Sequence, residues 1–105
     1  MDETNMIEEV DLEEYAKAGK LVPTARRYKL RIDKEHKVTE NPEPSGRQIL
    51  ALVGKTPEAY TLSMKLHGGQ AKPIGPDEKT DLRQPGVERF MTMPRDATEG
   101  AQRAT

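Results

Sequence analysis

The sequence predicts an α+β domain: a mixed sheet of four to five strands, one central helix and a flexible C-terminal tail. Two segments, residues 26–33 and 60–66, alternate apolar and polar side chains, which is the period of half-buried strands. Between them, residues 46–53 place apolar side chains at helical spacing. The 105-residue length allows one small domain, with a thin hydrophobic core because only 33% of the residues are apolar.

The first predicted strand, residues 26–33, separates apolar from basic side chains. One face would carry Tyr28, Leu30 and Ile32, and the other Arg27, Lys29 and Arg31. The pair at 33–34 can turn the chain into a weaker strand over residues 35–40, which completes a hairpin.

A short amphipathic helix is predicted over residues 46–53. Ser45 and Gln48 have the spacing of a capping box, and Gly54 suits the position after a helix end. Residues 60–66 then form a strand, and residues 71–75 form at most a short edge strand, because Pro73 cannot donate to a ladder.

The last predicted strand covers residues 87–93 and has an ambiguous face. Phe90 lies opposite Met91 and Met93, so either a bulge intervenes or one apolar face is exposed. These three side chains are therefore a candidate patch for partner proteins. The order strand, strand, helix, strand, short strand, strand is the β-grasp arrangement.

Residues 1–24 are predicted to form an acidic arm before the domain, which would span residues 25–94. The arm holds seven acidic and two basic residues, whereas basic residues are in excess in the rest of the chain. Asn5 and Glu8 have capping-box spacing, so residues 5–19 would form a short helix, ordered only when docked. The arm is expected either to remain a solvated tail or to bind a basic surface on its own domain or on another copy; the candidate contacts are Ile7, Val10 and Tyr15 with Arg27, Lys29 and Arg31.

Several classes of function are disfavoured by the composition. Without cysteine the chain has no disulfide and no thiolate, and its two histidines lie apart, so no metal site is expected. No phosphate loop or catalytic triad is recognisable, which predicts a protein that is not an enzyme and binds no cofactor. Few aromatic residues and a pI near 6.1 argue against nucleic-acid binding. No apolar run of about 18 residues is present, so a cytoplasmic protein without membrane contact is expected.

Three stretches resemble the bacterial multiubiquitin family over roughly residues 26–100. They read YKLRIDKEHKVTE, SGRQILALVGKTPEAYTLSMKLHGGQ and DLRQPGVERFMTMPRDATEG, and the combination PGVERF…PRD.TEG is much longer than a generic motif. The resemblance implies a ubiquitin-like β-grasp fold and occurrence alongside ubiquitin-type conjugation enzymes. Unlike the tandem members of the family, this chain holds a single copy.

The resemblance also implies a protein modifier made as a precursor. Residues 95–105 would form a flexible tail that is cleaved after Gly100, so that residues 101–105, beginning with Ala101, are a removable extension. Its implied partners are an activating enzyme that uses ATP to adenylate the Gly100 carboxylate, a conjugating enzyme, a processing and deconjugating peptidase, and target proteins. The tail residues that these enzymes would recognise are Pro94, Arg95, Asp96, Thr98 and Glu99.

Two other functions are compatible with the sequence. A β-grasp sulfur carrier shares the adenylation step but ends as a glycyl thiocarboxylate, usually after Gly-Gly without an extension, whereas here Glu99 precedes Gly100. A noncovalent assembly module would join copies through the acidic arm of one and the basic sheet of the next.

Overall fold

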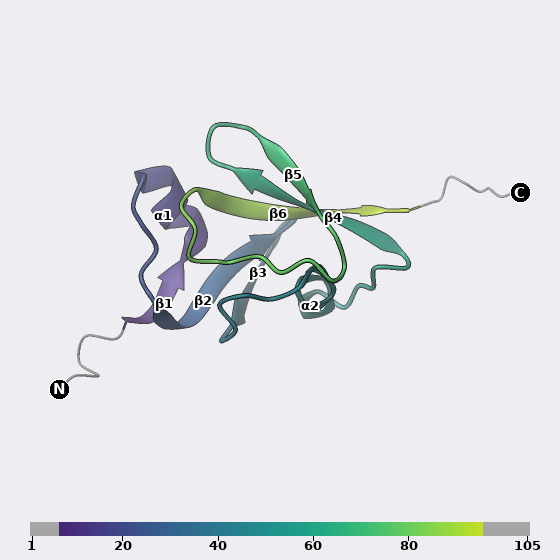
Figure 1. Cartoon of the computed structure of the whole chain (residues 1–105), viewed down its shortest axis with the longest axis horizontal. Helices are drawn as coiled ribbons and strands as arrows, with labels where there is room; N and C mark the ends of the chain where they lie inside the picture. The colour runs from purple at the N-terminus through teal and green to yellow at the C-terminus, as the bar shows by residue number, and fades with distance from the viewer. Residues whose placement is uncertain (1–6, 96–105) are drawn as a thin grey trace, which may run out of the picture.

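Six strands form one mixed sheet in the computed structural model, which describes residues 7–95 (Figure 1). The elements in chain order are β1 (Ile7–Asp11), α1 (Leu12–Ala18), β2 (Ala25–Ile32), β3 (Glu35–Thr39), α2 (Gly46–Leu52), β4 (Tyr60–Leu66), β5 (Ala71–Ile74) and β6 (Val87–Pro94). The predicted α+β class and β-grasp arrangement are confirmed. The structure adds one strand and one helix at the N-terminal end, β1 and α1.

The strand order is β1-β2-β6-β4-β5, and β3 pairs with β2. Tyr28 of β2 pairs with both β1 and β3, and Ile32 pairs with both β3 and β6. Strands β1 and β6 therefore share one edge of β2. Because β1 takes residues 25–29 of that edge, β6 pairs with β2 only at Ile32, opposite Phe90.

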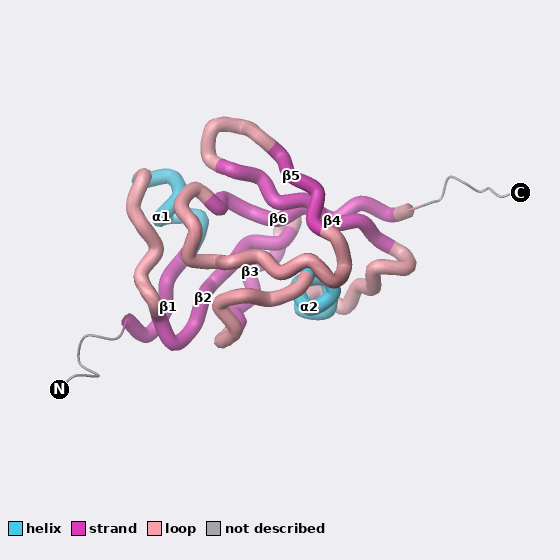
Figure 2. The backbone as a smooth tube through the Cα atoms, viewed as in Figure 1, coloured by secondary structure: helices cyan, strands magenta, loops and turns pink. Residues whose placement is uncertain are grey.

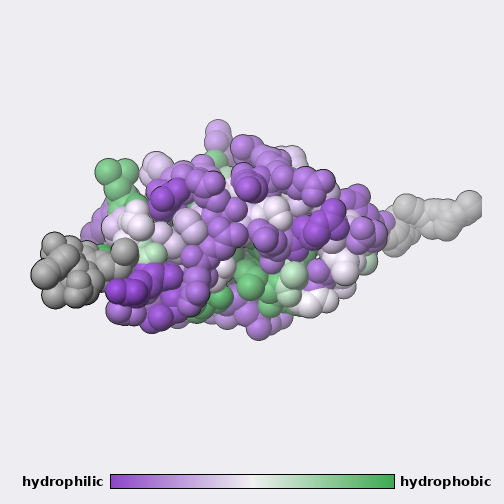
Figure 3. Space-filling view, turned by 60° about the horizontal axis from the view of Figure 1, so that its bottom comes forward, coloured by the Kyte–Doolittle hydropathy of each residue, from purple (hydrophilic) through white to green (hydrophobic). Residues whose placement is uncertain are grey.

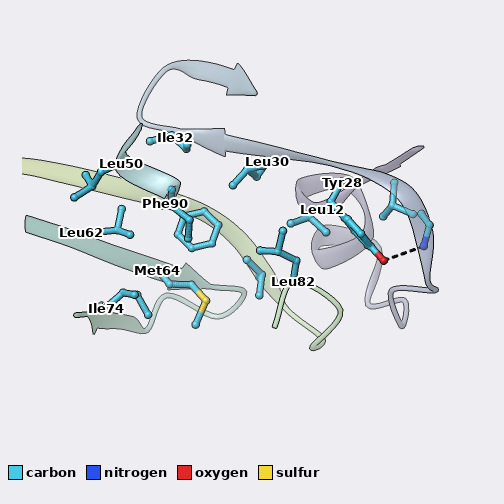
Figure 4. Close-up of a cluster of buried hydrophobic side chains, with 14 residues drawn as sticks. Leu12, Tyr28, Leu30, Ile32, Leu50, Leu62, Met64, Ile74, Leu82 and Phe90 are labelled. Atoms are coloured by element: carbon cyan, nitrogen blue, oxygen red, sulfur yellow. Dashed lines mark hydrogen bonds between the residues drawn. The ribbon is translucent and has the colours of Figure 1, made fainter. Parts of the chain in front are cut away.

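The hydrophobic core lies between the sheet, α2 and the loop that joins β5 to β6 (Figures 2 and 4). As predicted, Tyr28, Leu30 and Ile32 all face this core. The hydroxyl of Tyr28 accepts a hydrogen bond of 2.9 Å from the backbone N–H of Ala25, drawn as a dashed line in Figure 4. In the β5–β6 loop, Leu82 is fully buried and its N–H donates to the carbonyl of Pro42 at 2.8 Å.

A bulge in β6 resolves the ambiguity of its apolar face. Lys65 of β4 pairs with Arg89 and the next residue, Leu66, pairs with Val87, so Glu88 is the extra residue. Val87 and Phe90 consequently both point into the core. Phe90 is 0% exposed and cannot belong to a surface patch, which corrects that part of the predicted partner patch.

Helix α2 begins where its capping residues predict. The N–H of Gln48 donates to Oγ of Ser45 at 3.2 Å, and the N–H of Ser45 donates to Oε1 of Gln48 at 2.9 Å, so both bonds of the capping box are present. The first helical residue, Gly46, is packed against the β5 end: a Cβ at this position would lie 2.3 Å from the carbonyl oxygen of Gly75.

Replacing Gly46 with alanine is expected to destabilise the protein, although alanine normally favours a helix. The added methyl group would force the backbone of Gly75 away, so we expect the free energy of unfolding to fall by about 1–3 kcal/mol in urea titrations. Gly75→Ala is the matched control, because its Cβ would meet only Glu78 atoms at 3.8 Å. Equal stability of wild type and Gly46→Ala would contradict this close packing.

The N-terminal segment differs from the predicted helix over residues 5–19. Residues 7–11 form β1, and α1 begins at Leu12 with Asp11 as its N-cap, whose carboxylate accepts from the N–H groups of Glu13 and Glu14. Glu8 is thus a strand residue rather than part of a capping box, because pairing with β2 fixes the extended conformation. The predicted end at Gly19 is confirmed by its left-handed conformation, φ 70°.

Candidate functional site

The end of β6 is the place from which the C-terminal tail starts, at the right of Figure 1. Pro94 still pairs with Tyr60 of β4. Beyond it, the N–H of Arg95 donates to the carbonyl of Ala59 at 2.8 Å, and Nε of Arg95 donates to the carbonyl of Pro57 at 2.7 Å. The chain is therefore anchored to the domain up to Arg95. The other predicted tail residues lie outside the described residues: Asp96, Thr98, Glu99, Gly100 and Ala101.

A polar cluster holds the C-terminal end of β6 to the β2–β3 turn and to the segment after α2. Asp33, in the β2–β3 turn, accepts from the N–H of Thr92 at 2.9 Å through Oδ1 and from the hydroxyl of Thr92 at 2.5 Å through Oδ2. Nζ of Lys55 lies 3.3 Å from Oδ2 of Asp33 and 2.8 Å from Oγ1 of Thr92. The same Nζ lies 4.6 Å from the ring centroid of Tyr60. The sequence predicts a turn at Asp33 but gives no sign that Asp33, Lys55 and Thr92 meet.

The outer face of β6 carries two methionines next to the tail. Met91 pairs with Ser63 and Met93 with Thr61, on the side of the sheet away from the core. Met91 is half-buried and Met93 is 66% exposed. With Phe90 buried, these two side chains are what remains of the candidate partner patch.

The acidic N-terminal segment docks on its own domain. Strand β1 runs parallel to β2, and each of its acids meets a base: Glu8 with Arg26 at 3.2 Å and Arg27 at 3.3 Å, Glu9 with Arg27 at 3.5 Å, and Asp11 with Lys29 at 3.8 Å. Strongly hydrophilic residues accordingly gather at this end of the molecule in Figure 3.

Helix α1 continues this contact. Oε2 of Glu13 accepts from Nη1 of Arg31 at 3.0 Å. Val10 is fully buried, Tyr15 packs against the core and Ile7 stays at the surface. The contact that the assembly module would make between copies is thus made within one chain.

Three carboxylates within residues 7–95 have lowered pKa values, those of Glu13, Asp33 and Asp81. The pKa of Asp81 is lowered chiefly by the hydrogen bonds that it accepts from Arg83. Burial raises the pKa of Glu13, but its bonds to Arg31 and Lys17 outweigh burial and hold the pKa below the ordinary 4.5. Burial likewise raises the pKa of Asp33, and the bonds from Thr92 and Lys55 outweigh it, holding the pKa below 3.8. Each ionised group stabilises the fold above its ordinary pKa, and this contribution disappears as the pH falls through the lowered pKa of the folded state.

We therefore expect the free energy of unfolding to decrease as the pH drops below about 4.5. Urea titrations across the acidic range measure this slope. The double substitution Glu13→Gln with Asp33→Asn removes two of the three groups and should make the slope shallower, while an unchanged slope would show that Asp81 or other groups control acid unfolding.

The described residues offer neither a metal centre nor a membrane span. Over residues 7–95 no three histidine, aspartate or glutamate side chains come together as a set that could hold a metal ion. Neither helix in the same range has the length and apolar character needed to cross a membrane.

Comparison with known proteins gives one result. The multiubiquitin family model matches residues 28–95. The matched segment begins inside β2 and ends one residue after β6, so it contains the base of the tail up to Arg95 and leaves β1, α1 and residues 96–105, Gly100 included, outside. Comparisons with curated proteins and with solved structures gave no match.

Proposed function

Because the chain belongs to the multiubiquitin family, we propose that this ubiquitin-like protein is the precursor of a protein modifier. A peptidase cleaves after Gly100, and an activating enzyme adenylates the new carboxylate. A conjugating enzyme then transfers the protein, through the acyl group of Gly100, to target proteins. The proposed partners all act on the tail, and the domain serves as the surface by which they recognise it.

The distance between the last anchored residue and Gly100 is the observation that carries the proposal. The domain holds the chain through Arg95, and Gly100 is five residues further along the chain. Five residues can span at most about 17 Å when extended. This length allows Gly100 to enter an enzyme site while the domain docks outside it. The segment DATEG has no bulky side chain, and glycine fits a narrow passage.

The proposed chemistry has four steps. Hydrolysis of the Gly100–Ala101 peptide bond gives a carboxylate on Gly100 and releases Ala101 to Thr105. The carboxylate attacks the α-phosphate of ATP, which forms the acyl adenylate and expels pyrophosphate. A thiolate of the enzymes displaces AMP, and a target amine then displaces that thiolate to form the amide. The thiolates must belong to the partners, because this chain has no cysteine.

Intact mass after co-expression with the products of the neighbouring genes tests the proposal. The wild type is expected to lose residues 101–105 and to give adducts of higher mass, whereas Gly100→Lys should stay at full length. Gln102→Lys is the matched control, because it adds the same charge inside the released segment and should be processed. Full-length wild type in the presence of active enzymes would contradict maturation at Gly100.

The same spectra distinguish the sulfur carrier. A carrier would end at Gly100 with one oxygen replaced by sulfur and would give no adducts with other proteins. A modifier ends in a carboxylate and gives such adducts.

A further inference from the structure

We propose that Asp33, Lys55 and Thr92 are positioning residues for the C-terminal tail. These three residues, called the tail clamp here, hold β6 to the body near its end and thereby fix the point and direction from which the tail leaves. The inference rests on the proposed function, because it assigns to the clamp the task of presenting Gly100 to the activating enzyme.

The sheet explains why β6 needs a clamp. From Val87 to Pro94 the strand pairs with β4, but it pairs with β2 at one residue only, Phe90 opposite Ile32. From Met91 to Pro94 the strand pairs only with β4. A strand end held on one side frays easily. The clamp supplies the missing contacts on the β2 side, because Asp33 follows Ile32, the last β2 residue paired with β6.

The backbone of Asp33 supports a specific role for its carboxylate. Asp33 is the one non-glycine residue with positive φ, 56°, within residues 7–95. Turns with this conformation accept glycine, asparagine or aspartate, so the turn alone does not select a carboxylate. The carboxylate bonds to Lys55 and to both the N–H and the hydroxyl of Thr92 do explain it.

The clamp joins segments that are far apart in the sequence. Lys55 follows α2, Asp33 follows β2 and Thr92 lies in β6, so three separate parts of the domain meet two residues before Pro94. The ammonium of Lys55 also lies over Tyr60, the β4 residue that pairs with Pro94. Loosening the clamp would therefore loosen the base of the tail and leave most of the core unchanged.

The order that the clamp gives to the base of the tail should lower the KM of the activating enzyme for this protein. A tail base that is already ordered loses less conformational freedom when the enzyme binds it. Loss of the clamp should therefore weaken productive binding, seen as a higher KM, while kcat for adenylation stays unchanged because no clamp residue reaches the reacting carboxylate.

Amide hydrogen exchange on the isolated protein tests the clamp itself. In Thr92→Val and in Lys55→Met, the N–H groups of Thr92 and Arg95 are expected to exchange about tenfold faster than in the wild type, because bonds to a charged group are lost. Lys65→Met is the matched control: Lys65 of β4 pairs with Glu88 at 3.1 Å, near the other end of β6. Thr92→Ser keeps the hydroxyl and should exchange like the wild type. Equal exchange in the clamp and control variants overturns the clamp.

ATP–pyrophosphate exchange with the proposed activating enzyme tests the positioning role. We expect KM for the mature protein to rise about tenfold in Thr92→Val and Lys55→Met at unchanged kcat, and to stay at the wild-type value in Lys65→Met and Thr92→Ser. Faster amide exchange with an unchanged KM overturns the inference and leaves the proposed function intact. No exchange even with the wild type overturns the proposed function and with it the positioning role, while the amide data still decide whether the clamp holds β6.

Discussion

Replacing Phe90 with alanine is expected to lower the free energy of unfolding by about 3–5 kcal/mol. Phe90 is fully buried in the core and lies in Figure 4 among side chains from β2, α2 and β4. Removing the ring deletes its apolar contacts and leaves a cavity that a close-packed interior fills only in part. For a domain of this size the loss is a large fraction of the total stability.

Urea unfolding of Phe90→Ala and Met93→Ala provides the comparison. Met93 lies on the same strand but is 66% exposed, so its truncation should change the free energy of unfolding by no more than about 0.5 kcal/mol. If Phe90→Ala does not fold, Phe90→Leu takes its place: it should lower the free energy of unfolding by less than Phe90→Ala but still by more than Met93→Ala. Similar effects at both positions would contradict the bulge at Glu88 that turns Phe90 into the core.

Most of the β-grasp core could be predicted because its signals are local. Alternation over residues 60–66 gives β4 with its bounds unchanged, and the capping box at Ser45 gives the start of α2. The pleat and the helical turn repeat over a few residues, so periodicity in the sequence reports directly on which side chains face the core. The bulge in β6 was one of two predicted alternatives, and only the pairing with β4 decides between them.

The N-terminal segment could not be predicted because its structure depends on a partner strand. In β1 only Val10 is buried, so the strand has no alternation of its own and is extended because β2 pairs with it. Two spacings in this region suit a helix start, Asn5 with Glu8 and Asp11 with Glu14. Tertiary contact selects the second, since Leu12 and Ala16 then become buried.

The tail clamp carries no local signal for the same reason. Asp33 and Thr92 are 59 residues apart, and neither has an unusual neighbour in the sequence. The tail itself was predicted from resemblance to a family, and its residues from Asp96 onward lie outside the described part of the chain. Functional predictions for Gly100 thus rest on chemistry that only the co-expression experiment tests.

Replacing Leu12 with alanine is expected to lower the free energy of unfolding by about 2–5 kcal/mol, although Leu12 lies outside the family match. Its side chain is 1% exposed and packs in the same core cluster as Tyr28 and Leu30. If this is correct, β1 and α1 are part of the folding unit. The matched control is Leu21→Ala in the following loop, where the side chain is 77% exposed and truncation should cost at most about 0.5 kcal/mol.

Measuring stability in high salt shows whether buried apolar side chains or ion pairs contribute more to the docking of β1 and α1. The ion pairs of Glu8 and Glu9 with Arg27 involve side chains that are 40–66% exposed. Exposed pairs of this kind contribute about 0–1 kcal/mol each and are screened at about 1 M salt. Such salt should therefore lower the free energy of unfolding of the wild type by less than the substitution Leu12→Ala does. A larger effect of salt than of Leu12→Ala would mean that the ion pairs contribute more to docking than the buried apolar side chains of β1 and α1, which are Val10, Leu12 and Ala16.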